Sequence, residues 1–357
     1  MSSKILFILK KRHINYGNTS YGDVNPYGYN LSSGLFNSAK FVNDMLVDSG
    51  VDSHLVEVTD NNDIDREVTK YKPEIVVIEA FWVVPPKFDV LSKLHPNVTW
   101  VVRLHSEIPF LANEGVAMEW MQDIFDIPNV ILGFNSLKTV RDVSKFFEVK
   151  FPLRRNHIHK KIIFLPNYYP VGKHNTKYVF DKKGVVDVGC FGAIRPMKNQ
   201  LIQAFAAIEF ARKNYVGLNF HINAQRVERG DNALRNIRAL FAELPADYQL
   251  VEHDWLNHED FIKLVRKMDI GLQMSFSETF NIVAADFVSN GVPFVGSKEI
   301  PFLFPLFIAD PTDVADIVKK MGTSLRRKKF FPFLSPSKVD LTVYVKEARA
   351  IWLEFLL

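Results

Sequence analysis

Residues 277–297 read SETFNIVAADFVSNGVPFVGS, and they carry the clearest structural signal in this chain of 357 residues. The apolar run 270–274 just ahead of them ends in polar residues, as a buried strand does where it leaves a sheet. Glu278 is expected to open a helix, which the Gly-Val-Pro turn at 291–293 ends before the next apolar run. Strand, helix and strand in this order form the repeating unit of a parallel α/β sheet.

The start of the predicted helix has the chemistry of an anion site. The first backbone N–H groups of a helix, here near Thr279, Phe280 and Asn281, have no partner inside the helix. With the positive end of the helix dipole they suit a diphosphate. In an unbroken helix Glu278 and Asp286 stand about 12 Å apart along the axis and about 80° around it. This spacing exceeds that of a glycosidase carboxylate pair, so the two acids are expected to hold different parts of one elongated ligand.

Five residues of this stretch resemble the E-x-F-x(5)-E…G-x-P signature of retaining GT-B glycosyltransferases of the glycogen-synthase-like, family-4 type: Glu278, Phe280, Asp286, Gly291 and Pro293. An Asp replaces the second Glu, and Thr and Asn replace the small residues that flank the Phe. The resemblance implies two Rossmann-like, doubly wound domains that face each other across a cleft, with Asp286 on the ribose of a nucleotide sugar. The alternative is an amphipathic helix with two solvated acids.

A second motif, VVDVGCFGAIRPMKNQ at 185–200, is an apolar strand that runs into a turn with Gly192 and then into Arg195 and Lys198. In the family that the chain resembles, the matching basic pair binds the donor diphosphate. A departing diphosphate develops negative charge, which a fixed guanidinium and ammonium stabilise. The alternative is a pair of ordinary surface charges.

The first half of the chain offers a third motif, NVTWVVRLHSEIPF at 97–110, a buried strand that ends at His105 and Glu107. Ligands of open α/β sheets gather at the carboxyl ends of strands. His105 resembles the histidine that many relatives present to the transferred sugar, and Glu107 is expected to touch sugar or acceptor. The alternative is a histidine held by structural hydrogen bonds.

The first strand is followed by a long, tyrosine-rich connection, residues 11–33. Connections of this length are commonly functional or disordered. We expect Tyr16, Tyr21, Ser33 and Gly34 to contact the acceptor, with the connection serving as a lid; a floppy loop is the alternative. The glycines have P-loop spacing, but the required lysine is absent, which excludes an ATP-binding P-loop.

Apolar runs of strand type alternate with helical patterns along the chain, which predicts doubly wound α/β domains. In the first half the strand-type runs are 4–10, 53–58, 74–80, 99–104, 129–134 and 161–167, and the helical patterns are 35–47, 64–70, 86–94, 117–125 and 137–147. In the second half the strand-type runs are 185–191, 218–222, 248–252, 269–274 and 293–295. The predicted domains are 1–170 for the acceptor and 184–335 for the donor, with 340–357 as a helix that packs back on the first domain.

Composition narrows the function classes. Cys190 is the only cysteine, so a disulfide within the chain and a cysteine-based zinc cluster are excluded, and a reducing, cytoplasmic setting is expected. No apolar run is long enough for a transmembrane helix, and the N-terminus lacks the order of a signal peptide. The D-x-D sequence at Asp63 and Asp65 is interpreted as a helix start rather than a metal site. No metal and no cofactor are therefore expected.

Charge bears on the acceptor. The net charge of +4 excludes a strongly basic DNA-binding face, but residues 150–177 hold several Lys and Arg and no acid, and the basic run 326–329 precedes three phenylalanines. Basic and aromatic clusters bind nucleic acid or anionic membranes, although solvated charge is the commoner explanation. The single-chain format also resembles glycosyltransferases carried by tailed phages. Some of these modify hydroxymethylated DNA bases, which must be extruded from the stack.

The sequence therefore predicts a metal-independent, retaining glycosyltransferase that moves a sugar from a nucleoside-diphosphate-sugar to a hydroxyl acceptor. Its expected catalytic residues are His105, Arg195, Lys198 and Glu278, and its expected donor-binding residues are Gly192, Thr279, Phe280, Asn281 and Asp286. The acceptor alternatives are a hydroxymethylated DNA base, a saccharide and a lipid-linked sugar. A catalytically silent nucleotide-sugar-binding protein is the alternative to an enzyme.

Overall fold

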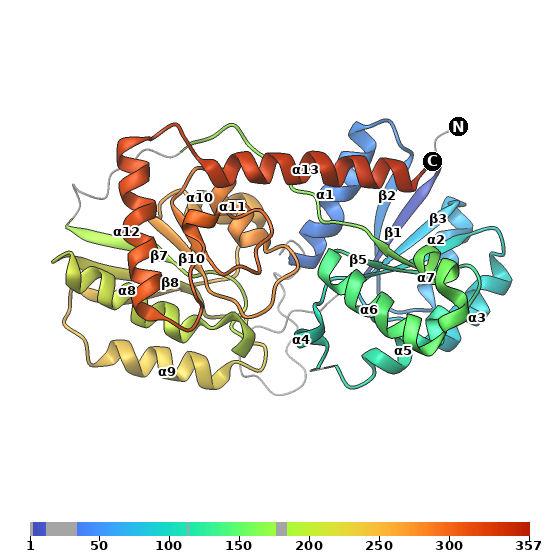
Figure 1. Ribbon diagram of the computed structural model, residues 1–357, viewed down its shortest axis with the longest axis horizontal. Coiled ribbons are helices and arrows are strands. Elements are labelled where there is room, and N and C mark those ends of the chain that lie inside the picture. The colour runs from blue at the N-terminus through green and yellow to red at the C-terminus, as the bar shows by residue number, and fades with distance from the viewer. Residues whose placement is uncertain (1–2, 12–33, 113, 176–183) are drawn as a thin grey trace. The chain divides into compact units, whose positions relative to one another are not determined.

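The computed structural model describes residues 3–11, 34–112, 114–175 and 184–357 (Figure 1). These residues divide into two compact units. The first unit holds the described residues up to Pro170 together with Val345–Leu357, and the second holds those from Val171 to Tyr344. The expected contacts of Tyr16, Tyr21 and Ser33 lie outside the described residues.

The first unit is a parallel sheet of six strands in the order β2-β1-β3-β4-β5-β6. The strands are β1 (Ile5–Lys10), β2 (Ser53–Val58), β3 (Ile75–Glu79), β4 (Thr99–Leu104), β5 (Val130–Phe134) and β6 (Ile162–Phe164). The helices between them are α1 (Gly34–Asp48), α2 (Asp63–Tyr71), α3 (Pro85–Leu94), α4 (Ile108–Leu111), α5 (Ala117–Phe125), α6 (Leu137–Lys150) and α7 (Arg155–Lys161).

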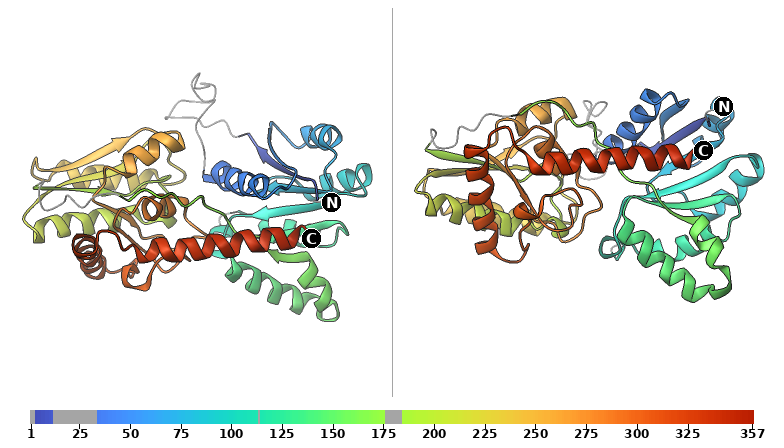
Figure 2. Two further views of the ribbon diagram at one scale, coloured as in Figure 1. Left: turned by 90° about the horizontal axis from the view of Figure 1, so that it is seen from above. Right: turned by 45° about the horizontal axis from the view of Figure 1, so that its top comes forward.

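The second unit is a parallel sheet of five strands in the order β11-β10-β7-β8-β9. The strands are β7 (Val185–Gly189), β8 (Gly217–Asn223), β9 (Tyr248–His253), β10 (Ile270–Gln273) and β11 (Phe294–Gly296). The helices are α8 (Gln200–Lys213), α9 (Asp231–Ala242), α10 (His258–Val265), α11 (Ile282–Ser289), α12 (Val314–Phe330) and α13 (Pro336–Phe355). Figure 2 shows helices on both sides of each sheet.

Coverage on both faces explains why the strands read as nearly continuous apolar runs. In β1, Leu6 and Ile8 belong to one buried cluster, and Ile5 and Phe7 belong to another on the opposite face. All four side chains are fully buried. The strand positions predicted from these runs are confirmed in both units, with ends that shift by up to three residues.

Two glycines bring α11 close to the second sheet. A Cβ atom on Gly271 or Gly189 would lie 2.6 or 2.7 Å from the ring of Phe287, which is closer than real Cβ contacts allow. Because neither strand carries a side chain there, Phe287 packs directly onto β7 and β10. This contact holds α11 close against β7 and β10.

The prediction that Glu278 opens a helix is wrong, because α11 begins four residues later at Ile282. Asn281 precedes the helix with φ 68° and ψ 89°, a left-handed conformation that cannot continue a right-handed helix. The helical spacing expected between Glu278 and Asp286 therefore does not apply. The sequence patterns also missed α4, α7, α9, α10 and α12, and the last helix begins at Pro336 rather than near residue 340.

The last residues of α13 are bound into the core of the first unit. Trp352 is fully buried, its ring centroid lies 5.7 Å from that of Phe7, and its Nε1–H donates to the carbonyl of Pro166 at 2.8 Å. The guanidinium of Arg103 lies 5.2 Å from the same indole ring. This one side chain therefore joins α13 to β1, to β4 and to the segment after β6.

We predict that Trp352→Ala lowers the free energy of unfolding of the first unit by about 3–5 kcal/mol, the usual range for a large aromatic removed from a core. The exposed Glu354 on the same helix provides a matched control, and Glu354→Ala should stay within about 0.5 kcal/mol of the parent. Urea denaturation of both variants measures the difference. Equal, small effects would contradict the packing role of Trp352.

Candidate functional site

The second sheet has a topological switch point at its central strand. The chain goes from β7 to β8 and β9 on one side and returns to β10 and β11 on the other. In open α/β sheets, ligands bind beside such a point, at the carboxyl ends of the strands. Gly192 follows β7 at this edge, and Glu278 follows β10.

Gly192 forms the turn that opens this edge. Its φ of 107° lies in the region that favours glycine, and its N–H donates to Asn223 Oδ1 at 3.0 Å. A Cβ atom on Gly192 would lie 4.0 Å from the side chain of Val283, so the turn adjoins the first turn of α11. Asn281 Oδ1 accepts the N–H of Ala284, and among the described residues no group accepts a hydrogen bond from the N–H of Ile282 or Val283. The switch point thus presents helix N–H donors beside a glycine turn, the usual setting for a phosphate.

Lys198 and Glu278 meet at the same edge. Lys198 ends a short 3-10 helix, Pro196–Lys198, and its Nζ bonds Glu278 Oε1. The segments that carry the two side chains are joined by a hydrogen bond from the N–H of Phe276 to the carbonyl of Met197 at 2.9 Å. Two residues that were predicted separately from the sequence therefore lie side by side in the structure.

Asn281 holds Glu278 in place. Its Nδ2 donates to Glu278 Oε1 and to Gln273 Oε1, each at 3.0 Å, while its Oδ1 accepts the N–H of Ala284 at 2.8 Å. Asn281 is therefore both the N-cap of α11 and a support for the acid. Its side-chain amide is used inside the protein, so any contact of Asn281 with a donor would come from its backbone.

Arg195 lies in the same connection but pairs with a different acid. Its guanidinium bonds Glu228, which also accepts from Arg226 Nε at 2.7 Å. Burial acts to raise the pKa of Glu228, but the charges of Arg195 and Arg226 outweigh it and hold that pKa below its usual range. Glu228 is therefore ionised at neutral pH and orients Arg195. No sequence pattern pointed to Glu228.

Asp286 lies in the second turn of α11 and is 1 % exposed. Its Oδ1 lies 2.7 Å from Nε2 of His258, the first residue of α10. Burial acts to lower the pKa of His258, but the hydrogen bond to Asp286 and its charge raise that pKa above the ordinary value of 6.5. The role of Asp286 at a ribose stays a prediction, and His258 is a partner that sequence analysis missed.

Phe280 is fully buried against Phe302 and Tyr344, with ring centroids 4.9 and 5.2 Å away. Its ring belongs to the core, so a donor could contact only its backbone. Thr279, next to it, is half-buried at the turn before α11. The phenylalanine of the signature thus anchors the turn that carries Glu278 and Asn281.

His105 lies in the first unit, directly after β4. Its Nε2 lies 2.5 Å from Glu79 Oε2, and its Nδ1 lies 3.2 Å from Asn135 Nδ2. Glu79 is completely buried and accepts from Arg103 Nη1 at 3.0 and 3.1 Å. Burial, followed by the charge of Arg103, lowers the pKa of His105, so the ring is neutral at neutral pH and Nε2 carries its proton toward Glu79.

Glu107 is also buried and already engaged. It accepts from Ser136 Oγ at 2.5 Å, and Lys138 Nζ lies 3.2 Å from its other oxygen. Gly34, the first residue of α1, is exposed. The proposed acceptor contacts of Glu107 and Gly34 remain predictions.

The basic stretch of the first unit is not free of acids in three dimensions. Arg154 pairs with Asp126 at 3.2 Å, and Arg155 lies 3.5 Å from Glu148. Lys161 is buried, where its Nζ donates to backbone carbonyls, and burial lowers its pKa to about 8. Neighbouring elements thus supply acids beside Arg154 and Arg155 that the linear sequence hides.

Two further expectations concern metals and membranes. Asp63 Oδ2 accepts the N–H of Thr59 at 3.0 Å, and Arg66 pairs with its other oxygen, so this acid stabilises the start of α2. Across the described ranges, no three His, Cys, Asp or Glu side chains converge as they would around a metal. Among the helices described, none combines the length and the hydrophobicity needed to cross a bilayer.

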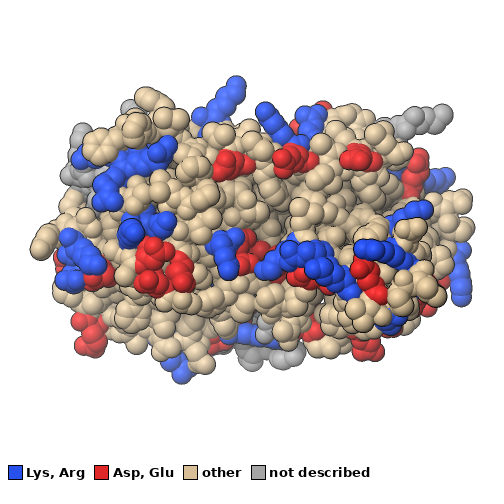
Figure 3. Space-filling view, in the orientation of Figure 1, with Lys and Arg blue, Asp and Glu red and all other residues tan. Residues whose placement is uncertain are grey.

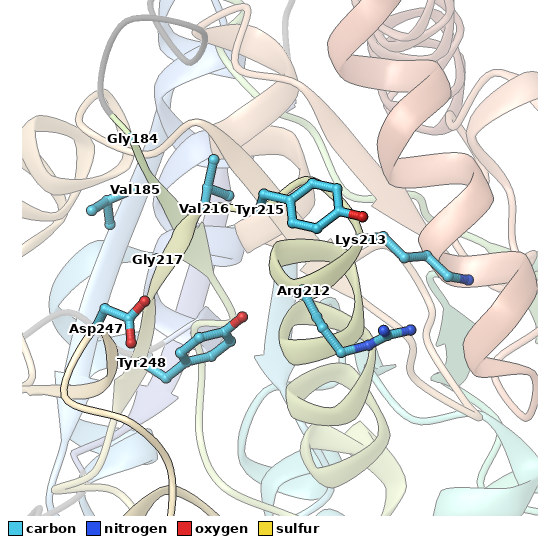
Figure 4. Close-up of a pocket in the computed structure, with 9 residues that line it drawn as sticks. All are labelled: Gly184, Val185, Arg212, Lys213, Tyr215, Val216, Gly217, Asp247 and Tyr248. Atoms are coloured by element: carbon cyan, nitrogen blue, oxygen red, sulfur yellow. The ribbon is translucent and has the colours of Figure 1, made fainter.

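An open depression of about 650 Å³ lies at the other edge of the second sheet, where β7, β8 and β9 begin. Figure 4 shows Asp247 and Tyr248 beside Gly217, with Arg212 and Lys213 on α8. Because parallel sheets bind ligands at the carboxyl ends of their strands, this depression is not assigned to the donor.

No protein-family model and no curated protein sequence matches the chain. Solved structures do match it. A UDP-forming α,α-trehalose-phosphate synthase from Burkholderia vietnamiensis is 13% identical, covers 99% of this chain and 96% of its own, and has a TM-score of 0.62. A sucrose-phosphate synthase from Thermosynechococcus elongatus is 13% identical over 99% of this chain and 98% of its own, with a TM-score of 0.62.

The N-terminal domain of a Candida albicans trehalose-6-phosphate phosphatase is also similar, with 13% identity over 99% of this chain and 96% of its own and a TM-score of 0.65. At these identities the similarity shows the fold. The expected α/β fold with two parallel sheets, the GT-B fold, is thereby confirmed. The matches give no support to a tailed-phage origin.

The pair of His258 and Asp286 predicts a pH dependence of stability. Because the pKa of His258 is raised in the folded chain, the pair stabilises fully below the ordinary value of 6.5, and this stabilisation is lost as pH rises through the folded pKa. His258→Gln should therefore lower the free energy of unfolding by about 1–2 kcal/mol at low pH and by less at high pH. Denaturation across pH 5.5–8.5 tests this, with exposed His159→Gln as the control. A loss that is independent of pH would contradict it.

Proposed function

We propose that the chain is a glycosyltransferase that moves a sugar from a nucleoside-diphosphate-sugar to a hydroxyl acceptor, with retention of configuration. One observation carries the proposal: Lys198, the Gly192 turn and the first turn of α11 lie together at the switch point of the second sheet. A cation, a glycine turn and helix N–H groups are the groups that a diphosphate requires. The similar solved structures named as trehalose-phosphate and sucrose-phosphate synthases support the reaction class.

The donor would be held along one line of contacts at this edge. The diphosphate would lie against the N–H groups of Ile282 and Val283, with Lys198 and Arg195 as cations. The sugar would lie toward Glu278, and the ribose toward Asp286, which would exchange part of its contact with His258 for ribose hydroxyls. Each of these acids and cations is already paired within the chain, so binding would replace internal ion pairs by contacts to the donor.

The reaction follows from these positions and from the resemblance to retaining GT-B enzymes. The bond between the anomeric carbon and the diphosphate breaks, and the leaving oxygen takes up negative charge that Lys198 and Arg195 stabilise. The same oxygen accepts the proton of the acceptor hydroxyl, which bonds the anomeric carbon on the same face. The resemblance implies that His105 contacts a sugar hydroxyl; its Nε2 proton is directed to Glu79, so its Nδ1 would have to exchange the amide N–H of Asn135 for that hydroxyl. No metal is required in this scheme, since the two cations supply the positive charge.

For the acceptor, we propose a saccharide or sugar-phosphate hydroxyl rather than a DNA base. Two similar structures are named as synthases of sugar phosphates. Of the basic residues on which a DNA interface would depend, Arg154 and Arg155 are paired with acids and Lys161 is buried. Incubation with labelled UDP-, GDP- and ADP-sugars and separate saccharide, sugar-phosphate and hydroxymethylated-DNA acceptors tests this preference. Transfer of the label to DNA alone would contradict a saccharide or sugar-phosphate acceptor.

We predict that Arg195→Ala and Lys198→Ala each lower the turnover number about a hundredfold at saturating donor, because the leaving diphosphate loses a cation. Lys213→Ala removes a cation of the same unit at the opposite edge of the sheet and is the matched control. Initial rates of nucleotide release with chelator present measure the effect. Turnover near that of the parent in both variants would refute the donor site.

We also predict that Asp286→Ala weakens binding of the free nucleoside diphosphate at least about tenfold, because the ribose contact is lost. Glu259→Ala removes an exposed acid of the same unit, in the first turn of α10, and should alter the affinity by less than about threefold. Calorimetric titration with UDP, GDP and ADP measures both. Equal affinities in the parent and Asp286→Ala would remove the ribose assignment.

A further inference from the structure

The connection from α12 to α13 carries an apolar surface that the proposed function does not use. Phe330, Phe331, Phe333 and Leu334, here named the α12–α13 tip, are all exposed, with Phe333 91 % and Phe330 67 % exposed. Single exposed hydrophobic residues are ordinary on protein surfaces, whereas a contiguous cluster marks a site of interaction. The tip is such a cluster, because four of five consecutive residues are large, apolar and exposed.

Hydrogen bonds hold the backbone of the tip in this orientation. The buried Lys328 donates from Nζ to Asn175 Oδ1 at 2.7 Å and to the carbonyl of Pro332 at 3.1 Å. Asn175 Nδ2 donates to the same carbonyl at 2.8 Å. The N–H of Phe331 bonds the carbonyl of Arg327 at 2.8 Å and closes the last turn of α12. The exposure of the aromatic side chains is therefore built into the fold.

The surroundings of the tip are strongly basic. Between Asp316 and Asp340 the chain has seven basic residues and no acidic one: Lys319, Lys320, Arg326, Arg327, Lys328, Lys329 and Lys338. Arg326 and Lys329 are exposed beside the phenylalanines. Figure 3 shows Lys and Arg side chains gathered over the upper part of α12 in that view. The tip therefore places an apolar cluster directly beside a group of positively charged side chains.

We propose that the α12–α13 tip docks this protein on an anionic lipid membrane. Aromatic and aliphatic side chains enter the interface between head groups and acyl chains, while Lys and Arg remain with the acidic head groups. The exposed Val339 and Val343, four residues apart on the first turns of α13, extend the apolar area. The acyl chains of a membrane can cover an apolar surface that is made of both aromatic rings and branched side chains.

A nucleic acid fits this surface less well than a membrane. A base stacks on the face of an aromatic ring, but Arg327 lies 5.5 Å from the centroid of the Phe331 ring and Lys329 lies 5.8 Å from that of Phe330. These cations occupy positions over the rings that a base would need. In a membrane the same pairs keep each charge at head-group level above a ring that points inward.

The tip lies away from the proposed donor edge. Ser324 Oγ accepts the N–H of Phe294, the first residue of β11, at 3.2 Å, and Lys338 Nζ donates to the carbonyl of Ser289 at the end of α11. Both contacts are at the edge where strands begin, whereas the donor groups lie where strands end. Docking through the tip would therefore leave the proposed donor edge open. The membrane proposal does not depend on the proposed function.

Co-sedimentation of the full chain with vesicles tests the proposal. The parent should bind vesicles of phosphatidylcholine and phosphatidylserine, and bind pure phosphatidylcholine at least about tenfold more weakly. Phe330→Ser with Phe333→Ser should lower the partition coefficient about tenfold or more without changing the thermal unfolding temperature. Arg326→Glu with Lys329→Glu should lower it similarly and remove its dependence on salt. Failure of the parent to bind either vesicle overturns the proposal.

Two further variants make the test independent of folding defects. Val149→Ser with Leu153→Ser removes apolar residues that are 84 % and 99 % exposed in the first unit, and binding should be unchanged. Phe333→Trp should show a blue-shifted emission with phosphatidylserine vesicles and quenching by brominated lipid. A Phe333→Trp emission that moves only with added DNA, or only with protein concentration, would assign the tip to nucleic acid or to a second copy instead.

Discussion

The hydrogen bonds of Asn281 are the constraint on which the proposed donor edge depends. Its left-handed backbone ends the segment after β10, its Oδ1 caps α11, and its Nδ2 fixes Glu278. Without this turn a continuous helix would carry Glu278 away from β7, and Lys198 would lose its partner. The packing of Phe287 over two glycines adds a second constraint, because it sets α11 against the same two strands. Together they make a polar, cation-bearing edge from segments far apart in the sequence.

Electrostatic pairing is the second general feature of the site. In the structure each expected cation has an acidic partner: Lys198 bonds Glu278, and Arg195 bonds Glu228. In the first unit the buried Glu79 is bonded by Arg103 and by His105. Such pairs keep charged side chains oriented in a partly buried setting, where an unpaired charge is costly. A phosphate bound at the proposed donor edge would therefore compete with a carboxylate, and its affinity would reflect the difference between two ion pairs.

Sequence reasoning captured the strands because their residues are buried on both faces, and apolar runs such as Ile75–Glu79 report that burial directly. It placed Gly192, Lys198 and Glu278 at neighbouring strand ends for the same reason. It missed the start of α11 because it placed the first helical residue at Glu278, although Asn281 is of a type that favours the N-cap and tolerates a left-handed backbone. It also missed Glu228, His258 and Glu79, whose roles depend on contacts across the fold, and it overrated the basic stretch near Arg154 because the paired acids come from other elements.

The most direct test of the donor site is a calorimetric titration of Glu278→Gln with whichever of UDP, GDP and ADP binds the parent most tightly. The substitution keeps the size of the side chain but removes the negative charge that holds Lys198. If Lys198 is the diphosphate cation, the variant should bind the free nucleotide several-fold more tightly than the parent, while sugar transfer falls. When Glu278→Gln is made in a Lys198→Met background, nucleotide binding should not become tighter. Weaker nucleotide binding by Glu278→Gln, in a variant that unfolds at the parent's temperature, would contradict the account.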